Sequence, residues 1–214
     1  MKRVMLLLLL AAIGTNAAPG PENCDGLNIT LPRKDLDKIF GDWVLVASVS
    51  NDPKGAELLA NLSSSVVELQ LLPDNKTIDY TERNLFLNKL CTKYFINMPM
   101  PSDSESDQYT LRINAGTLET DGVVSQFNDS AQVEFFESCS DCLMMIYKGT
   151  VGHYLLSYRR EGQHQDVEQL KAARSDVEKL ARCLGLPHDQ PFSYDGAADF
   201  CPKKSSLEAT AEQS

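Results

Sequence analysis

The 214-residue chain is predicted to fold as an all-β antiparallel sandwich or barrel, followed by one amphipathic helix. Three observations lead to this prediction. About eight short runs typical of β-strands follow one another, with turn residues between them and no helical period among them. Several runs alternate apolar and polar residues, and the period becomes helical only near the C-terminus.

The strand-like runs are short and are separated by residues that favour turns, such as Asn51-Asp52-Pro53, Pro73-Asp74-Asn75 and Asp121-Gly122. The alternation is clear where Val67 and Leu69 flank Glu68, but it is imperfect elsewhere. Some inward positions are therefore expected to be polar, as in a barrel with a wet or ligand-filled interior and also as on an edge strand. The predicted strands are residues 43–50, 65–72, 77–86, 90–97, 108–114, 131–137, 142–148 and 153–160.

A single helix is predicted over residues 163–184, where apolar residues recur at helical spacing. Asp166 lies near its start, Arg182 lies near its end, and Gly185 and Pro187 then stop it. We expect its apolar side to pack on the outside of the sheet, and the alternative is that this side binds a partner. The apolar positions are Val167, Leu170, Ala173, Val177, Leu180, Ala181 and Leu184.

The composition excludes several classes of protein. Hydrophobic residues make up 43% of the chain, and Gly and Pro are present in ordinary numbers, which argues against collagen-like and wholly disordered chains. The chain has 20 Lys and Arg against 30 Asp and Glu, a net charge of −10, so nucleic acid is not an expected partner. The length suits one domain or at most two small ones.

The first residues have the pattern of a secretory signal peptide. Met1-Lys2-Arg3 is a basic start, an apolar run over residues 5–13 follows, and Thr15-Asn16-Ala17 offers a cleavage site. A retained membrane anchor is the alternative, although the run is too short to span a bilayer. We therefore expect a signal peptide over residues 1–17, a domain over 18–202 and a polar tail over 203–214, with no stable membrane insertion.

Two further features agree with export. Acceptor sequons for N-glycosylation occur at Asn28, Asn61, Asn75 and Asn128, so these residues are expected on the surface. The six cysteines all follow the predicted signal peptide, and an even number is typical of an oxidising compartment. The sequence alone leaves 15 pairings open. An extracellular protein, in plasma or mucus, is the expectation.

With this order of elements, Gly41-Asp42-Trp43 resembles the first motif of the lipocalin family. The motif stands at the start of the first predicted strand, after Leu36-Asp37-Lys38-Ile39-Phe40. The resemblance implies that Gly41 and Trp43 close one end of the barrel and that a cation from the last strand, Arg159 or Arg160, stacks on the indole ring. The middle motif of the family is not clear, and residues 149–154 are its nearest counterpart.

Other segments resemble one branch of the family, that of α1-acid glycoprotein and apolipoprotein M, with the fish organotin-binding and saxitoxin/tetrodotoxin-binding proteins related to them. This resemblance implies an eight-stranded antiparallel up-and-down lipocalin barrel with one C-terminal amphipathic α-helix packed outside. It spans residues 24 to about 202 of the chain. The segments that carry it are residues 24–27, 36–43, 77–82, 94–98 and 177–187.

The resemblance also implies two disulfides, Cys24–Cys183 and Cys91–Cys201. For the remaining Cys139-Ser140-Asp141-Cys142, a redox centre would require a helix N-terminus, and a zinc site would require a second nearby pair. A disulfide that closes a tight hairpin is the hypothesis favoured here. No metal and no cofactor are expected.

A lipocalin binds by burying a small hydrophobic molecule in its barrel. The resemblance places Glu82, Arg112 and Tyr158 in the pocket, where Glu82 would favour basic ligands and Arg112 acidic ones. For each of the three, the alternative is a solvated face of the sheet. The alternation adds candidates for the lining, each of which suits ordinary core equally well: Leu45, Ala47, Tyr80, Phe95, Leu111, Phe135, Met145, Tyr147, Tyr154 and Leu156.

The function expected from these observations is that of a secreted, glycosylated carrier of small lipophilic molecules, xenobiotics or toxins, working as a monomer. An enzyme is not expected, because no Gly-x-Ser-x-Gly elbow is present. A cysteine-dependent isomerase, like the lipocalin-type prostaglandin synthase, would need a free thiol in the barrel. The other alternative is a plasma glycoprotein that acts by contacting proteins or cells rather than by carrying a ligand.

Overall fold

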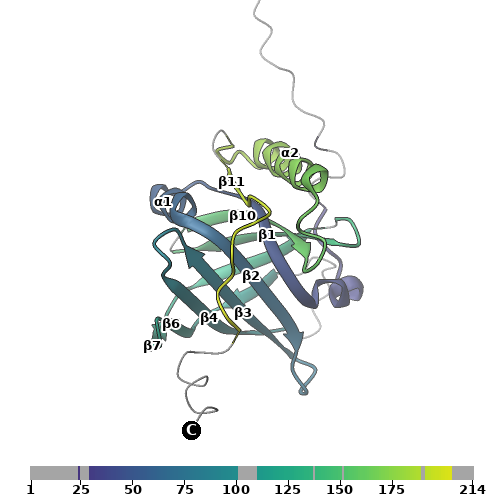
Figure 1. Cartoon of the computed structure of the whole chain (residues 1–214). Helices are drawn as coiled ribbons and strands as arrows, with labels where there is room; N and C mark the ends of the chain where they lie inside the picture. Colours follow the sequence, from purple (N-terminus) through teal and green to yellow (C-terminus); the bar gives the residue numbers. More distant parts are fainter. Residues whose placement is uncertain are drawn as a thin grey trace, which may run out of the picture.

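The computed structural model describes residues 24, 29–100, 110–136, 138–150, 152–188 and 191–203. The expected signal peptide, Asn28 and most of the expected C-terminal tail lie outside these residues. Within them, the chain forms one antiparallel sheet that curves into a barrel, with helix α2 (Val167–Cys183) lying across its outside (Figure 1). No helix in the described part of the chain is long and apolar enough to cross a membrane.

The hydrogen-bonded strand order is β5-β8-β9-β10-β1-β2-β3-β4-β6-β7, and the short β11 also pairs with β1. All eight strands expected from the sequence are present. The strand bounds are β1 (Gly41–Ser50), β2 (Leu62–Leu71), β3 (Thr77–Phe86), β4 (Cys91–Pro99), β5 (Thr110–Ile113), β6 (Gly116–Thr120), β7 (Val123–Phe127), β8 (Ala131–Phe136), β9 (Cys142–Gly149), β10 (Gly152–Arg160) and β11 (Phe192–Ser193).

The additional strands β6 and β7 extend one hairpin rather than change the class of fold. Strand β5 pairs with β8, and the chain continues after a break of two residues into β6, which pairs with β7. The two pairs belong to one long hairpin, and β6 also pairs with β4. If each broken strand is counted once, eight strands close the barrel, as the resemblance to lipocalins implies.

The end of the barrel where β1 begins is closed by Trp43 and Arg160. The Arg160 guanidinium carbon lies 4.1 Å from the centre of the Trp43 ring, and the indole Nε1 donates to the Ile39 carbonyl at 2.8 Å. The 3-10 helix η1 (Arg33–Ile39) supplies that carbonyl. Gly41 has a φ of +121°, and a Cβ there would lie 2.5 Å from the Arg160 side chain. Arg160 is therefore the stacking cation.

Arg159, the other candidate, points to the opposite side of β10 from the barrel interior. Its guanidinium contacts Cys142 Sγ and lies in the field of Asp176 on α2 and of Asp141. Burial lowers the pKa of Arg159, and these two carboxylates oppose that shift. Arg159 therefore belongs to the interface between the sheet and α2.

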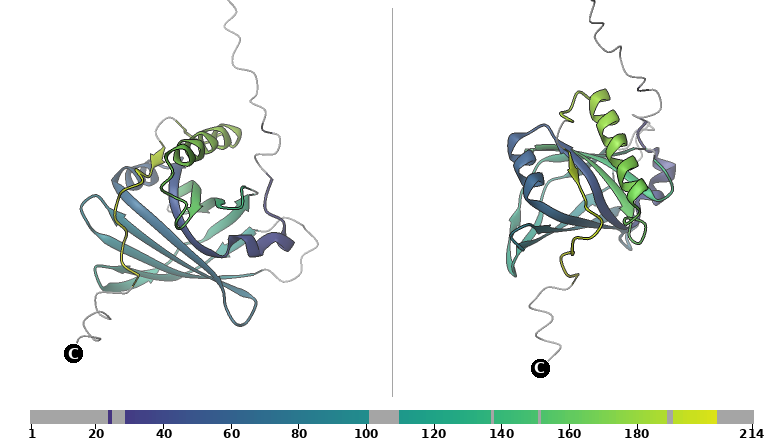
Figure 2. Two further views of the ribbon diagram at one scale, coloured as in Figure 1. Left: turned by 45° about the vertical axis from the view of Figure 1, so that its right-hand side comes forward. Right: turned by 45° about the horizontal axis from the view of Figure 1, so that its top comes forward.

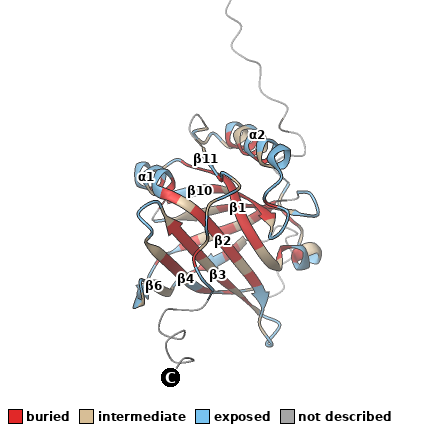
Figure 3. Ribbon diagram, in the orientation of Figure 1, coloured by how far each residue is buried: buried red, intermediate tan, exposed pale blue. Residues whose placement is uncertain are grey.

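Helix α2 packs on the outer face of β1, β9 and β10, as its apolar stripe predicts. Val177, Leu180 and Ala181 are buried against Ala47 and Leu155. Asp166 caps the helix by accepting from the Gln169 amide at 2.9 Å. Figure 2 shows the helix lying across the strands, and Figure 3 shows exposed residues along its outer side. The apolar side of the helix is therefore buried against the chain's own sheet, rather than left free to bind a partner.

The three disulfides are those expected: Cys24–Cys183, Cys91–Cys201 and Cys139–Cys142. The last closes the turn between β8 and β9, as the hairpin hypothesis predicts. Each of the six cysteines lies in the described part of the chain, and none is free.

A short helix lies between β1 and β2, in a segment that was expected to form a turn. Helix α1 (Pro53–Asn61) begins at Asp52, whose carboxylate accepts from the amides of Lys54 and Gly55. Gly55 is required there because a Cβ would overlap the Ser50 side chain. An Asp followed by Pro is also a signal for a helix start, and here it starts a helix rather than a turn.

Candidate functional site

The barrel contains a cavity of about 440 Å³ at the end opposite Trp43. Helix α1 and the strands β1, β2, β3, β4, β7, β9 and β10 supply its walls. Such a volume suits a small molecule. The lining residues are Leu45, Asp52, Lys54, Leu58, Leu59, Leu62, Tyr80, Glu82, Asn84, Tyr94, Phe127, Met145, Tyr147, Thr150, Tyr154 and Leu156.

Glu82 is the acidic group on the inner wall of this cavity. Residues 80, 82 and 84 point to the same side of β3, because side chains alternate along a strand. The Tyr80 hydroxyl and the Asn84 amide each donate to the Glu82 carboxylate at 2.7 Å. Burial raises the pKa of Glu82, and the two hydrogen bonds oppose that shift. No ion pair joins Glu82 to a basic residue of the described chain.

Aromatic side chains surround this carboxylate. Tyr94 packs edge-to-face on Phe127, with ring centres 5.3 Å apart, and Tyr147 packs on Tyr154 at 6.0 Å. Burial, followed by the charge of Glu82, raises the pKa of Tyr94 to about 12. The phenols are therefore neutral at physiological pH, and the wall presents π faces and hydroxyl groups around one acid.

Asp129 fixes the orientation of Tyr147 at the edge of the cavity. Its carboxylate accepts from the Tyr147 hydroxyl and from the Thr150 amide, the latter at 2.9 Å. Although burial opposes ionisation, hydrogen bonds from Thr150 and Tyr147 hold the pKa of Asp129 below its usual range. Asp129 accepts three hydrogen bonds from Tyr147 and Thr150 and does not line the cavity, whereas Glu82 accepts two and lies on its inner wall.

The mouth of the cavity is formed in part by α1. Leu58 and Leu59 extend the apolar lining, while Asp52 and Lys54 place one charge of each sign at the rim. The helix depends on the Asp52 cap and on the close approach of Gly55 to β1. The position of the mouth therefore depends on a segment for which the sequence predicted a turn.

Several residues expected in the pocket do lie inside the barrel. Tyr80, Glu82, Tyr147 and Tyr154 line the cavity. Tyr158 and Phe135 are buried in the barrel core next to it, and Tyr158 belongs to the same buried cluster as Tyr80. Of the other candidates from alternation, Leu45, Met145 and Leu156 line the cavity and Leu111 lies in the core.

Three expected pocket residues lie elsewhere. Arg112 is exposed on the outer face of β5, because its neighbours Leu111 and Ile113 fill the barrel core. Phe95 is 39% exposed on the outside of β4, since Tyr94 and Ile96 take the inward positions. Ala47 packs against α2, because a bulge between Leu45 and Ala47 reverses the alternation along β1.

Some lining residues were not predicted from the sequence, although strand alternation and strand pairing pointed to two of them. Asn84 follows Glu82 by two residues on the same strand, and Tyr94 lies opposite Glu82 in the pairing of β3 with β4. Thr150, Phe127 and the residues of α1 lie in turns or in segments not assigned to strands, where alternation gives no guidance. In the part of the chain that the structure describes, no group of three or more His, Cys, Asp or Glu could hold a metal ion.

The chain is similar in sequence to two known toxin-binding proteins. No family model matches the chain. Saxitoxin and tetrodotoxin-binding protein 2 of Takifugu pardalis is 49% identical over 202 residues, which cover 94% of this chain and 50% of that protein. The chain is therefore a homologue of this toxin-binding protein over most of its own length. Saxitoxin and tetrodotoxin-binding protein 1 of the same species is 48% identical over the same shares.

The solved structures agree on the fold. The siderocalin Ex-FABP is similar with a TM-score of 0.53 and 13% identity, over 76% of this chain and 97% of that one. This likeness shows the lipocalin type of barrel. The chain spans about half the length of the relatives it matches.

Proposed function

We propose that this protein binds a small organic cation in its cavity, with Glu82 as the anionic anchor. The observation that supports the proposal most strongly is the environment of the Glu82 carboxylate. Four tyrosines line the cavity around it, and no basic residue in the described part of the chain forms an ion pair with it. A cation would pair with Glu82 and contact the π faces around it. In a water-poor cavity this attraction is screened less than at the surface.

The relatives support this choice of ligand. Their names state that they bind saxitoxin and tetrodotoxin, and both molecules carry guanidinium groups. A guanidinium group donates two parallel hydrogen bonds to a carboxylate and stacks on aromatic rings. The apolar part of the wall, formed by Leu45, Met145 and Leu156, would bury a lipophilic portion of a ligand, as an organotin compound or a basic amphiphile presents.

We further propose that the protein is secreted and glycosylated and that it carries its ligand outside the cell. The pattern of residues 1–17, the four sequons and three disulfides support export. Asn61, Asn75 and Asn128 are exposed, as glycan acceptors must be. A binding protein rather than a cysteine-dependent isomerase agrees with the paired state of the six cysteines.

The experiment is calorimetric titration of the full-length protein with tetrodotoxin, an organotin, a basic amphiphile, retinol and a fatty acid. Saturable one-to-one binding of the cationic members, with weaker binding of the fatty acid, is expected. Preference for the fatty acid would contradict the proposed charge of the ligand. No binding to any member by a folded protein would favour a plasma glycoprotein that acts through contacts with proteins or cells.

A further inference from the structure

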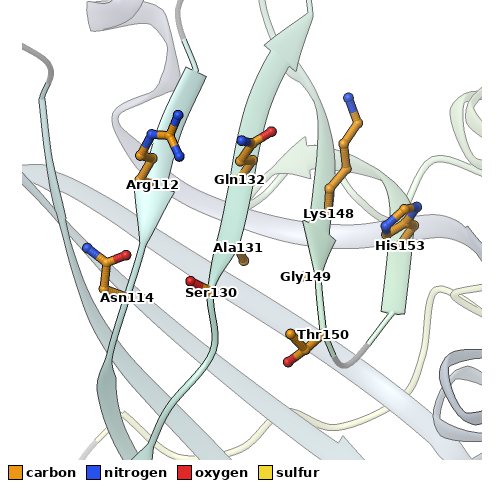
Figure 4. A pocket seen from close by; sticks show the side chains of 9 residues that line it. All are labelled: Arg112, Asn114, Ser130, Ala131, Gln132, Lys148, Gly149, Thr150 and His153. Carbon is orange, nitrogen blue, oxygen red and sulfur yellow. The ribbon is translucent and has the colours of Figure 1, made fainter.

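A second polar depression lies on the outside of the barrel, and Thr150 lines both this depression and the cavity that contains Glu82. It has a volume of about 430 Å³ and lies over β5, β8, β9 and β10. Figure 4 shows Arg112, Gln132, Lys148 and His153 standing side by side on these four strands. Below them lie the smaller side chains of Asn114, Ser130 and Thr150.

The register of the sheet places these four side chains in one row. Arg112 pairs with Gln132, Gln132 with Lys148, and Lys148 with His153. Directly paired residues point to the same face of a sheet, and neighbouring strands lie about 4.8 Å apart, so the row is roughly 14 Å long. Asn51 continues it, since its side-chain amide lies 3.4 Å from His153 Nδ1.

Every member of this row can donate a hydrogen bond, and two members carry fixed positive charge. In the described chain, no acidic residue forms an ion pair with Arg112. Lys148 Nζ lies 3.0 Å from Glu134 Oε2, on the neighbouring row. A concentration of donors on one face is notable in a protein whose net charge is −10.

We propose that this row is a second binding site, which takes a ligand carrying sulfate or phosphate groups. A tetrahedral oxyanion accepts hydrogen bonds in several directions, and it can therefore bridge donors that stand on neighbouring strands. A carboxylate accepts in one plane and fits a single guanidinium better. The length of the row suits two such groups on one ligand, and Glu134 limits affinity by competing for Lys148.

The test is calorimetric titration of the full-length protein at low and at physiological salt. The probes are pyrophosphate, a sulfated disaccharide and vesicles that contain a phosphoinositide, so that a soluble phosphate, a sulfated sugar and a lipid headgroup are distinguished. We expect saturable binding of at least one probe, weakened about tenfold in Arg112→Ala and in Lys148→Ala. Lys171→Ala on α2 is the control, and it should bind as the original protein does.

Two further variants distinguish binding at this row from binding inside the barrel. Glu134→Gln should strengthen binding, because it releases Lys148 and removes a repelling charge. Glu82→Gln should leave binding of the oxyanion unchanged, because Glu82 lies inside the barrel. The proposal is overturned if none of the probes binds, or if binding weakens equally in Lys171→Ala and Arg112→Ala. Neither result would affect the proposal for the cavity.

Discussion

At the scale of single residues, Glu82 and Arg112 show what determines a binding role in this fold. Both were predicted from the same resemblance, yet Glu82 lies in the cavity and Arg112 lies on the outer face. The difference follows from strand alternation, because Leu111 and Ile113 already fill the inward positions of β5. Resemblance identified the residue types, and the register of each strand determined the side to which they point.

The affinity of the cavity for a permanent cation should depend on pH through Glu82. Burial raises the pKa of Glu82, so folding favours its neutral form. That contribution to stability is complete below the pKa of the unfolded chain and is lost as the pH rises through the folded pKa. A bound cation requires the carboxylate instead. Affinity for a quaternary ammonium ligand should therefore fall as the pH falls through the folded pKa.

Titration of such a ligand across a pH series measures this effect, because the ligand itself does not change charge. Glu82→Gln should remove most of the dependence, since the amide does not titrate in this range. An unchanged pH profile in Glu82→Gln would assign the dependence to another group.

The Trp43–Arg160 contact should contribute measurably to stability. Arg160→Ala removes the stacked guanidinium and its 3.0 Å hydrogen bond to the Phe40 carbonyl. We expect a loss of about 1–2 kcal/mol in the free energy of unfolding, together with a change in Trp43 fluorescence. Urea unfolding measures the loss. Arg112→Ala, at an exposed arginine, serves as the control, and an equal loss there would argue against a specific role for the stack.

At the scale of elements, the segments with a strong periodic pattern were predicted well, whereas the short segments without such a pattern were not. Helix α2 and eight strands follow from their patterns, whereas α1 and the β6–β7 hairpin were missed. No residue of β7 is buried, so alternation carried no signal there. The Asp121-Gly122 turn was recognised, and both residues have positive φ, as a two-residue hairpin turn requires. The lesson is that such a turn predicts strands on both sides of it.

The packing of α2 on the barrel gives a prediction for this element. Leu180 is 1% exposed and belongs to the cluster between α2 and the sheet, whereas Val167 is 62% exposed. Leu180→Ala should destabilise the fold by about 2–5 kcal/mol, because it leaves a cavity. Val167→Ala should change stability by less than about 0.5 kcal/mol. Urea unfolding of both variants checks this, and similar losses would contradict the observed packing.

At the scale of the whole molecule, the barrel holds one candidate site in its interior and one on its outer face, and Thr150 lines both. Trp43 and Arg160 close one end, α1 forms part of the mouth at the other, and the Cys91–Cys201 disulfide ties the C-terminal segment to β4. The class of fold and the Cys139–Cys142 hairpin could be predicted from the sequence pattern, and the closed end and the other two disulfides from the resemblance to lipocalins. The shape of the cavity could not, because it depends on the bulge in β1 and on a short helix.

We propose above all that Glu82 makes the cavity selective for cations. The most direct measurement compares two ligands with the same aryl-alkyl skeleton, one ending in trimethylammonium and one in carboxylate, on the original protein and on Glu82→Gln. We expect one-to-one binding that favours the cation by at least about tenfold in the original protein, with that preference largely lost in Glu82→Gln. Equal affinities in the original protein, or a preference that survives in Glu82→Gln, would contradict it.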